Sequence, residues 1–207
     1  MTQTTRLYCN LMEEIKPRLA VINGVLTGVC GPMPKRIAQE FCYLQLRLIC
    51  ELIALACLVA HGDVMGTRTA GIRKRYAADW IMEMLQELHP NFYPQPITHR
   101  VERQRQESVP AHHRHELIKS EYLTRNDLIQ LYRDCGKLLH RGTVEDILSR
   151  HERSVDFERV RQWTNKIVIL LKDHLIQLID PKLLYLVTMD GPSGKVQIAS
   201  AHWTNKP

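Results

Sequence analysis

The stretch LICELIALACLVA, residues 48–60, constrains the fold more than any other part of the chain. It is apolar on nearly every side of a helix, which is typical of a helix at the centre of a fold. Glu51 interrupts it, and the uncharged run from Leu52 to Ala60 is far shorter than the ~20 residues that a membrane span needs. The sequence therefore predicts a core helix from Lys35 to about His61 and no membrane segment.

Helical periodicity predicts further helices on both sides of this one. The expected ranges are 4–28, 72–88, 124–139 and 156–179. Pro17 lies inside the first range and is expected to break or kink it. Thr124 and Asp127 resemble a capping box at the start of the helix that ends near Leu139, and Gly142 supplies a stop.

Two regions depart from the helical pattern. HPNFYPQP, residues 89–96, opens a polar and basic insertion of about 90–123, with short β-compatible pieces at ITHRV and ELIKS. After Pro181, alternating apolar residues around the turn GPSGK predict a β-hairpin. We therefore predict an all-α fold: a bundle of four to five helices with an irregular basic insertion and a C-terminal β-hairpin. The helical domain is expected to span 1–181, and the hairpin appendage 182–207.

The charge balance favours an anionic partner. The formal net charge is +6, and ten histidines add positive charge below neutral pH, so nucleic acid is favoured over a membrane surface. The six cysteines form no C-x-x-C pair, four of them lie in apolar helical patterns, and no signal peptide is recognisable. We interpret them as reduced thiols in a cytoplasmic protein.

The insertion concentrates basic residues in HRVERQRQESVPAHHRH, residues 99–115. One interpretation is an RNA-contacting arm, and the alternative is a solvated loop. The candidate RNA-binding residues are Arg100, Arg103, Arg105 and Arg114. The histidines of HHRH, together with His99, raise the question of a metal, but no cysteine or acidic partner is spaced to complete a site. We predict no metal and no cofactor.

LYRDCGKLLHRG, residues 131–142, places Arg133 and His140 on one helix face, because seven residues make about two turns. Lys137 lies between them and Arg141 follows, so both are possible supporting residues. A histidine can move a proton during attack by an RNA 2′-hydroxyl, and an arginine can stabilise the charge on the phosphorane. The alternative is a solvated face, with Arg133 paired to Asp134 or another acid and His140 interacting with the helix dipole.

RDCGKLLH resembles the signature of the HEPN superfamily: an arginine followed by a polar residue, then a histidine after four to six residues in all. Many HEPN domains are all-helical, metal-independent ribonucleases that act as toxins or in antiviral defence, and their motifs usually meet across a homodimer. The resemblance implies that Arg133 and His140 are catalytic and that Asp134 is the polar orienting residue. Arg105 and His112 have the same spacing, but Pro110 lies between them.

Arg47 and Glu51 stand one turn apart on the apolar core helix. They are expected either to satisfy each other or, through Glu51, to orient Arg133 or His140. The functional hypothesis is a dimeric, metal-independent endoribonuclease, with an antitoxin or a defence-system component as a possible partner. The alternatives are a non-catalytic helical module that binds RNA or a protein, and a regulatory dimer that associates through the hairpin.

Overall fold

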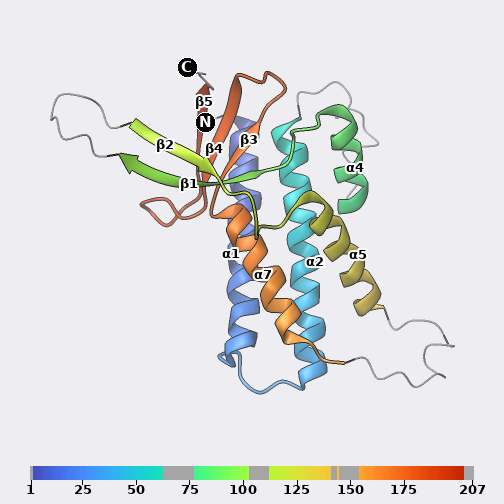
Figure 1. Cartoon of the computed structure of the whole chain (residues 1–207). Helices are drawn as coiled ribbons and strands as arrows, with labels where there is room; N and C mark the ends of the chain where they lie inside the picture. Colours follow the sequence, from blue (N-terminus) through green and yellow to red (C-terminus); the bar gives the residue numbers. More distant parts are fainter. Residues whose placement is uncertain (1, 63–76, 103–111, 141–143, 145–153, 203–207) are drawn as a thin grey trace.

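A computed structural model describes residues 2–62, 77–102, 112–140, 144 and 154–202, with the backbone alone for 99–102, 112–115 and 202. The helices are α1 (Gln3–Thr27), α2 (Lys35–Ala60), α4 (Ala78–Leu88), α5 (Arg125–Leu139) and α7 (Phe157–Leu171) (Figure 1). The strands are β1 (Gln95–Glu102), β2 (His112–Leu117), β3 (Asp173–Gln177), β4 (Leu183–Thr188) and β5 (Gln197–His202).

α2 is the central helix, as its sequence predicts. It packs along α1 and also contacts α4, α5 and α7. Its fully buried side chains include Cys42, Leu46, Ile49, Cys50, Ile53, Ala54 and Cys57. By length and hydropathy α2 could also cross a membrane, a test that a buried core helix passes as well. All six cysteines are free, and Cys30 alone among them is exposed.

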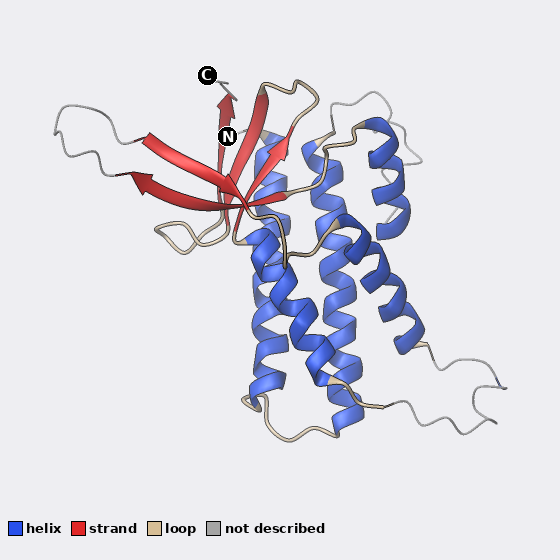
Figure 2. Cartoon of the chain, viewed as in Figure 1, coloured by secondary structure: helices blue, strands red, loops and turns tan. Residues whose placement is uncertain are grey.

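A five-stranded antiparallel sheet lies at one end of the bundle, beside the start of α1 and the end of α2 (Figure 2). The strand order is β2-β1-β3-β4-β5. The prediction of an all-α fold is therefore wrong. The insertion is not wholly irregular, because its ends form β1 and β2. The expected C-terminal hairpin is present as β4 and β5, and it is hydrogen-bonded to β3 within the same sheet.

β1 joins the two parts of this sheet by changing partner along its length. Gln95 and Pro96 pair with β3, whereas residues 97–102 pair with β2. The β1–β2 hairpin consequently projects from the body of the protein (Figure 1). The insertion is thus tied to the C-terminal strands by hydrogen bonds between segments far apart in sequence.

The last predicted helix, 156–179, is wrong beyond Leu171, where α7 ends. Leu175 keeps the helical period, but the chain from Asp173 is a strand paired with β4. Alternation explains the switch: Ile176 faces the helical core, and Leu175 joins a second apolar cluster with Ile97 and Leu184. As a strand, β3 can bury apolar side chains on both of its faces, and β4 provides hydrogen-bond partners for the β3 backbone.

His174 connects β3 to the helices α1 and α7 through hydrogen bonds. Its side chain is fully buried; Nδ1 donates to the Leu171 carbonyl at 2.9 Å, and Nε2 accepts from the Tyr8 hydroxyl at 2.7 Å. Burial lowers the pKa of His174 to about 4, so the ring is neutral at physiological pH. Burial also raises the pKa of Tyr8, which keeps its hydroxyl protonated and able to donate.

The local predictions for α1, α4 and α5 can be compared with the structure. α1 continues through Pro17 without ending, so the expected break is absent. The capping box of Thr124 and Asp127 is confirmed at the start of α5. The third predicted helix, 72–88, is seen as α4 from Ala78 onward, while residues 72–76 and the expected stop at Gly142 lie outside the described residues.

Candidate functional site

α5 carries the Arg–His pair that the sequence singled out, and both of its ends are fixed by local hydrogen bonds. The Thr124 hydroxyl accepts from the Asp127 backbone N–H at 3.1 Å, and the Asp127 carboxylate accepts from the Thr124 N–H at 3.2 Å. At the other end His140 is the capping residue, and its N–H donates to the Gly136 carbonyl at 3.1 Å. The capping box fixes where α5 begins.

Arg133 lies on the side of α5 that faces α4. Its Nη2 donates to Glu83 Oε1 at 3.2 Å, and its Nε lies 3.6 Å from Asp79 Oδ2. About half of the side chain, 52%, is exposed. Exposed ion pairs of this kind are worth at most about 1 kcal/mol each. The guanidinium is thus balanced by two carboxylates, as the solvated-face alternative expected, yet an anion from solution can compete for it.

Asp134 lies next to Arg133 in sequence but faces α7. Its Oδ2 accepts from Arg159 Nη2 at 2.7 Å, and its Oδ1 accepts from Gln130 Nε2 at 2.8 Å. The side chain is 18% exposed, so this pair is better shielded than those of Arg133. These contacts join α5 to α7. The orienting role that the family resemblance implies for Asp134 therefore stays a prediction.

Lys137 and His140 are exposed in and just after the last turn of α5. The ammonium of Lys137 lies near the negative end of the helix dipole, where a cation is stabilised. Arg133 is seven residues before His140, a rise of roughly 10 Å along the axis, and its guanidinium is turned toward α4. Arg141, the other supporting residue that the sequence suggested, lies outside the described residues.

The Arg47–Glu51 pair of α2 meets α5 at Tyr132. The Glu51 carboxylate lies 3.4 Å from Arg47 Nε, and Arg47 Nη2 donates to the Tyr132 hydroxyl at 2.8 Å. The guanidinium also lies 4.2 Å from the centre of the Tyr132 ring. Gly136 makes room for this arrangement, because a Cβ there would come within 3.2 Å of Arg47 Nη1. These contacts favour the interpretation that Arg47 and Glu51 neutralise each other.

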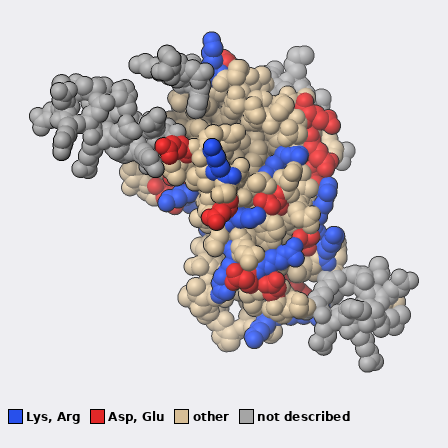
Figure 3. Space-filling model, viewed as in Figure 1, with Lys and Arg blue, Asp and Glu red and all other residues tan. Residues whose placement is uncertain are grey.

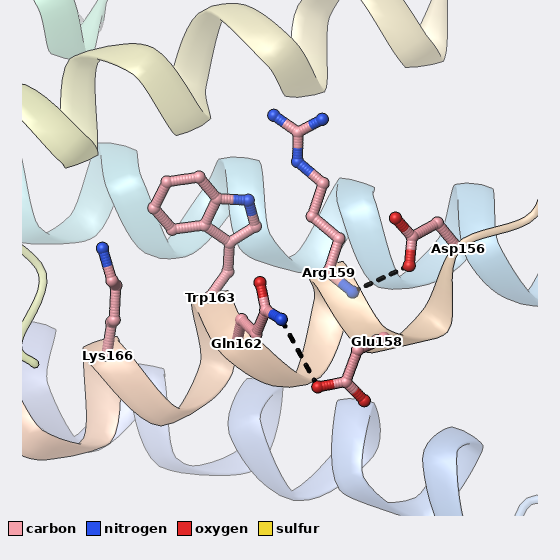
Figure 4. Close-up of a pocket in the computed structure, with 6 residues that line it drawn as sticks. All are labelled: Asp156, Glu158, Arg159, Gln162, Trp163 and Lys166. Atoms are coloured by element: carbon pink, nitrogen blue, oxygen red, sulfur yellow. Dashed lines mark hydrogen bonds between the residues drawn. The ribbon is translucent and has the colours of Figure 1, made fainter.

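The groove between α5 and α7 is the main feature that the sequence did not reveal. Both helices pack on α2, but their backbones scarcely approach each other. One cavity of about 300 Å³ lies along α7 and is lined by residues of that helix and its N-cap: Asp156, Glu158, Arg159, Gln162, Trp163 and Lys166 (Figure 4). An adjoining cavity of about 410 Å³ is lined by Tyr43, Asp134, Lys137, Leu138, Ser154 and Arg159. Arg159 borders both, and we call the two together the α5–α7 groove, of which the second cavity is the part lined by both helices.

Two ion pairs span this groove. Arg159 bonds Asp134, and Lys166 Nζ lies 3.1 Å from Asp127 Oδ2. Trp163 lies between the two cations along α7, with Lys166 Nζ 5.2 Å from the centre of its ring. The charge of Arg159 opposes the rise that burial causes in the pKa of Tyr43. A sequence signal did exist: Arg159, Trp163 and Lys166 recur at helical spacing on one face of α7.

The predicted RNA-binding arginines fall on the projecting hairpin. Arg100 and Arg114 are opposite each other across the β1–β2 ladder. Their side chains are not described, and Arg103 and Arg105 lie outside the described residues. The role of this arm in binding RNA therefore stays a prediction.

On the face shown in Figure 3, cationic and acidic side chains are interspersed, so no single basic patch dominates it. Within residues 2–62, 77–102, 112–140, 144 and 154–202, no group of three or more His, Cys, Asp or Glu side chains is placed to hold a metal ion. Comparison with known proteins gives no match to a family model, to a curated protein or to a solved structure.

Proposed function

We propose that this chain is a metal-independent endoribonuclease of HEPN type, with its site at the C-terminal end of α5. The observation that carries the proposal is the accessibility of His140, which is exposed at the end of the helix whose preceding turns present the half-exposed Arg133. A polymeric substrate has to reach its catalytic groups at the surface. Both groups meet that requirement.

The chemistry is attack by the RNA on itself. The 2′-oxygen forms a bond to phosphorus while the bond from phosphorus to the 5′-oxygen breaks. His140 takes the 2′-hydroxyl proton or supplies the proton that the leaving 5′-oxygen gains. Arg133 stabilises the charge that develops on the phosphorane oxygens with its planar set of N–H donors. The products are a 2′,3′-cyclic phosphate and a free 5′-hydroxyl.

Arg133 has to exchange Asp79 and Glu83 for phosphate before it can act. These are exposed pairs of small worth, so the exchange costs little. The roughly 10 Å rise between the two catalytic residues favours a composite site, in which His140 of one protomer works beside Arg133 of its partner. We therefore propose a homodimer. A toxin or antiviral-defence role, with a neutralising or activating partner, belongs to the same proposal.

The test is RNA cleavage in EDTA by the wild-type protein and by His140→Ala, with folding of both checked by circular dichroism. We expect the wild-type protein to produce cyclic-phosphate ends and the variant to lose this activity. Equal cleavage by the two proteins would remove His140 from the mechanism. Light scattering on the same samples tests the homodimer.

A second candidate function is a non-catalytic module that binds RNA. The pairing of Arg133 with Asp79 and Glu83 favours it, because a guanidinium held by carboxylates is a structural group until something displaces them. Measurable RNA affinity without cleavage of any RNA offered, in wild-type protein of confirmed fold, would favour this candidate over the nuclease.

A further inference from the structure

The α5–α7 groove combines the features by which proteins hold unpaired nucleic acid. Such sites pair cations that follow the phosphate backbone with aromatic rings on which bases stack. Here Arg159, Trp163 and Lys166 follow one another along one face of α7, and Lys137 extends the groove on α5. Arg159 and Lys166 are seven residues apart, a rise of roughly 10 Å, with the indole between them.

The indole of Trp163 carries a polar group that the described residues leave unsatisfied. Its Nε1–H is shielded from solvent, and within the part of the chain that the structure describes it has no hydrogen-bond partner. Buried indole N–H groups usually find an acceptor. Figure 4 shows the nitrogen on the edge of the ring that is turned toward Arg159. An acceptor oxygen beside that guanidinium would satisfy both groups.

Arg159 is held in place by an exchangeable partner. It bonds Asp134 at 2.7 Å, yet half of its side chain, 50%, is exposed. A phosphate can replace the carboxylate as a bidentate acceptor, because guanidinium groups bind both in the same planar manner. Release from Asp134 would leave the guanidinium able to hold a phosphate in the groove that Trp163 also lines.

The groove also leads to the proposed cleavage site. Asp134, Lys137 and Leu138 line its second cavity, and they belong to the last turns of α5 before His140. A chain lying along α7 over Arg159 continues past Lys137 toward the end of that helix. Arg133 faces α4 instead, on the other side of α5.

We propose that the α5–α7 groove binds a short segment of single-stranded RNA, with one base on Trp163 and the adjoining phosphates on Arg159 and Lys166, and guides it to the end of α5. The inference rests on the proposed function in taking RNA as the ligand. It adds where the RNA lies and why it must be unpaired. Bases in a duplex are stacked and cannot reach the indole.

The experiment measures binding apart from cleavage. A short mixed-sequence single-stranded RNA with methylated 2′-hydroxyls carries no nucleophile, so affinity can be measured by fluorescence anisotropy with the wild-type protein. We expect Trp163→Ala to weaken binding roughly tenfold to a hundredfold through lost stacking. Trp163→Phe keeps a ring without the N–H, and we expect a smaller loss of about threefold to tenfold. The same RNA in duplex form should bind more weakly than the single strand.

Variants of the Arg159–Asp134 ion pair distinguish a role in RNA binding from a merely structural role. If Arg159 and Asp134 only hold the helices together, removal of either residue acts in the same direction. If Asp134 competes with phosphate, Arg159→Gln weakens binding by about tenfold and flattens its salt dependence, whereas Asp134→Asn tightens it by about threefold. Lys182→Gln, on an exposed residue between β3 and β4, is the charge-matched control and should leave the affinity within about twofold.

The two proposals fail separately. Wild-type affinity in Trp163→Ala and Arg159→Gln, or no RNA binding at all, overturns the groove. Weakening by Asp134→Asn to the same extent as by Arg159→Gln also overturns it, since the pair is then structural. If the groove variants lose affinity for the methylated RNA while the wild-type protein cleaves no unmethylated RNA of the same sequence, the groove inference stands and the nuclease proposal falls.

Discussion

His174 and His140 place the same side chain in opposite surroundings. His174 lies where the helices meet the sheet, is fully buried and has both ring nitrogens hydrogen-bonded. His140 lies exposed at the end of α5, in the proposed cleavage site. Burial lowers the pKa of His174 to about 4 and removes it from proton exchange near neutral pH. Exposure therefore decides which histidine is accessible to a substrate and which one contributes to the fold.

The largest effect is expected from His140→Ala, which should change RNA cleavage without changing stability. We expect cleavage to fall by roughly 100-fold to 10,000-fold, the usual contribution of a general acid or base. The unfolding midpoint should stay unchanged, because an exposed side chain contributes little to stability. His140→Gln should lose as much activity, since an amide does not exchange protons in this range. If His140→Ala lost stability along with activity, His140 would also contribute to the fold, and the contrast with His174 would be wrong.

The buried histidine should appear in the pH dependence of stability. Between pH 6.5, its ordinary pKa, and about 4, its pKa in the folded protein, the unfolded chain binds a proton that the folded protein does not. The free energy of unfolding therefore falls as the pH falls through this window, by about 3 kcal/mol from His174. His61, whose pKa burial also lowers, acts in the same direction.

Urea unfolding across this pH range measures the effect. His174→Gln should be less stable than the wild-type protein at neutral pH and should show a shallower decline toward acid. The remaining slope would belong to His61 and other groups. Identical slopes for the two proteins would contradict the assignment to His174.

Tyr8→Phe removes one hydroxyl and leaves the Nε2 acceptor of His174 buried without a donor. An unsatisfied buried group of this kind costs about 1–3 kcal/mol, so we expect the free energy of unfolding to drop by that amount. RNA cleavage should be unchanged below the unfolding transition. Leu7→Ala, on the exposed neighbour in α1, is the control and should stay within about 0.5 kcal/mol of the wild-type protein.

The smallest effect is expected where Arg133 meets α4. Asp79→Asn combined with Glu83→Gln should change stability by less than about 1 kcal/mol, because both ion pairs are exposed. Cleavage should rise by about threefold at low salt, since Arg133 no longer has to leave its carboxylates, and the gain should shrink as salt screens the charges. A drop in cleavage would instead mean that the carboxylates position Arg133 for catalysis.

Features that depend on a single segment of the chain were predictable from the sequence. The all-round apolar surface of α2 can be satisfied at the centre of a bundle, and Thr124 with Asp127 caps α5 through bonds within four residues. The alternating residues around GPSGK form β4 and β5 as expected. Arg133, within α5, and His140, which caps it, were also identifiable as candidates, because their spacing can be read from the sequence.

Features that depend on partners far away in the chain are set by tertiary packing. DHLIQ keeps a helical period in sequence, but β4 and the two apolar faces of the sheet make it a strand. Arg133 and Asp134 are neighbours in sequence, yet Arg133 forms its ion pairs with α4 and Asp134 forms its ion pair with α7. The α5–α7 groove exists because two helices pack on α2 without closing on each other. Local periodicity fixes which face a residue lies on, but the neighbour that covers that face is set by packing across the whole chain.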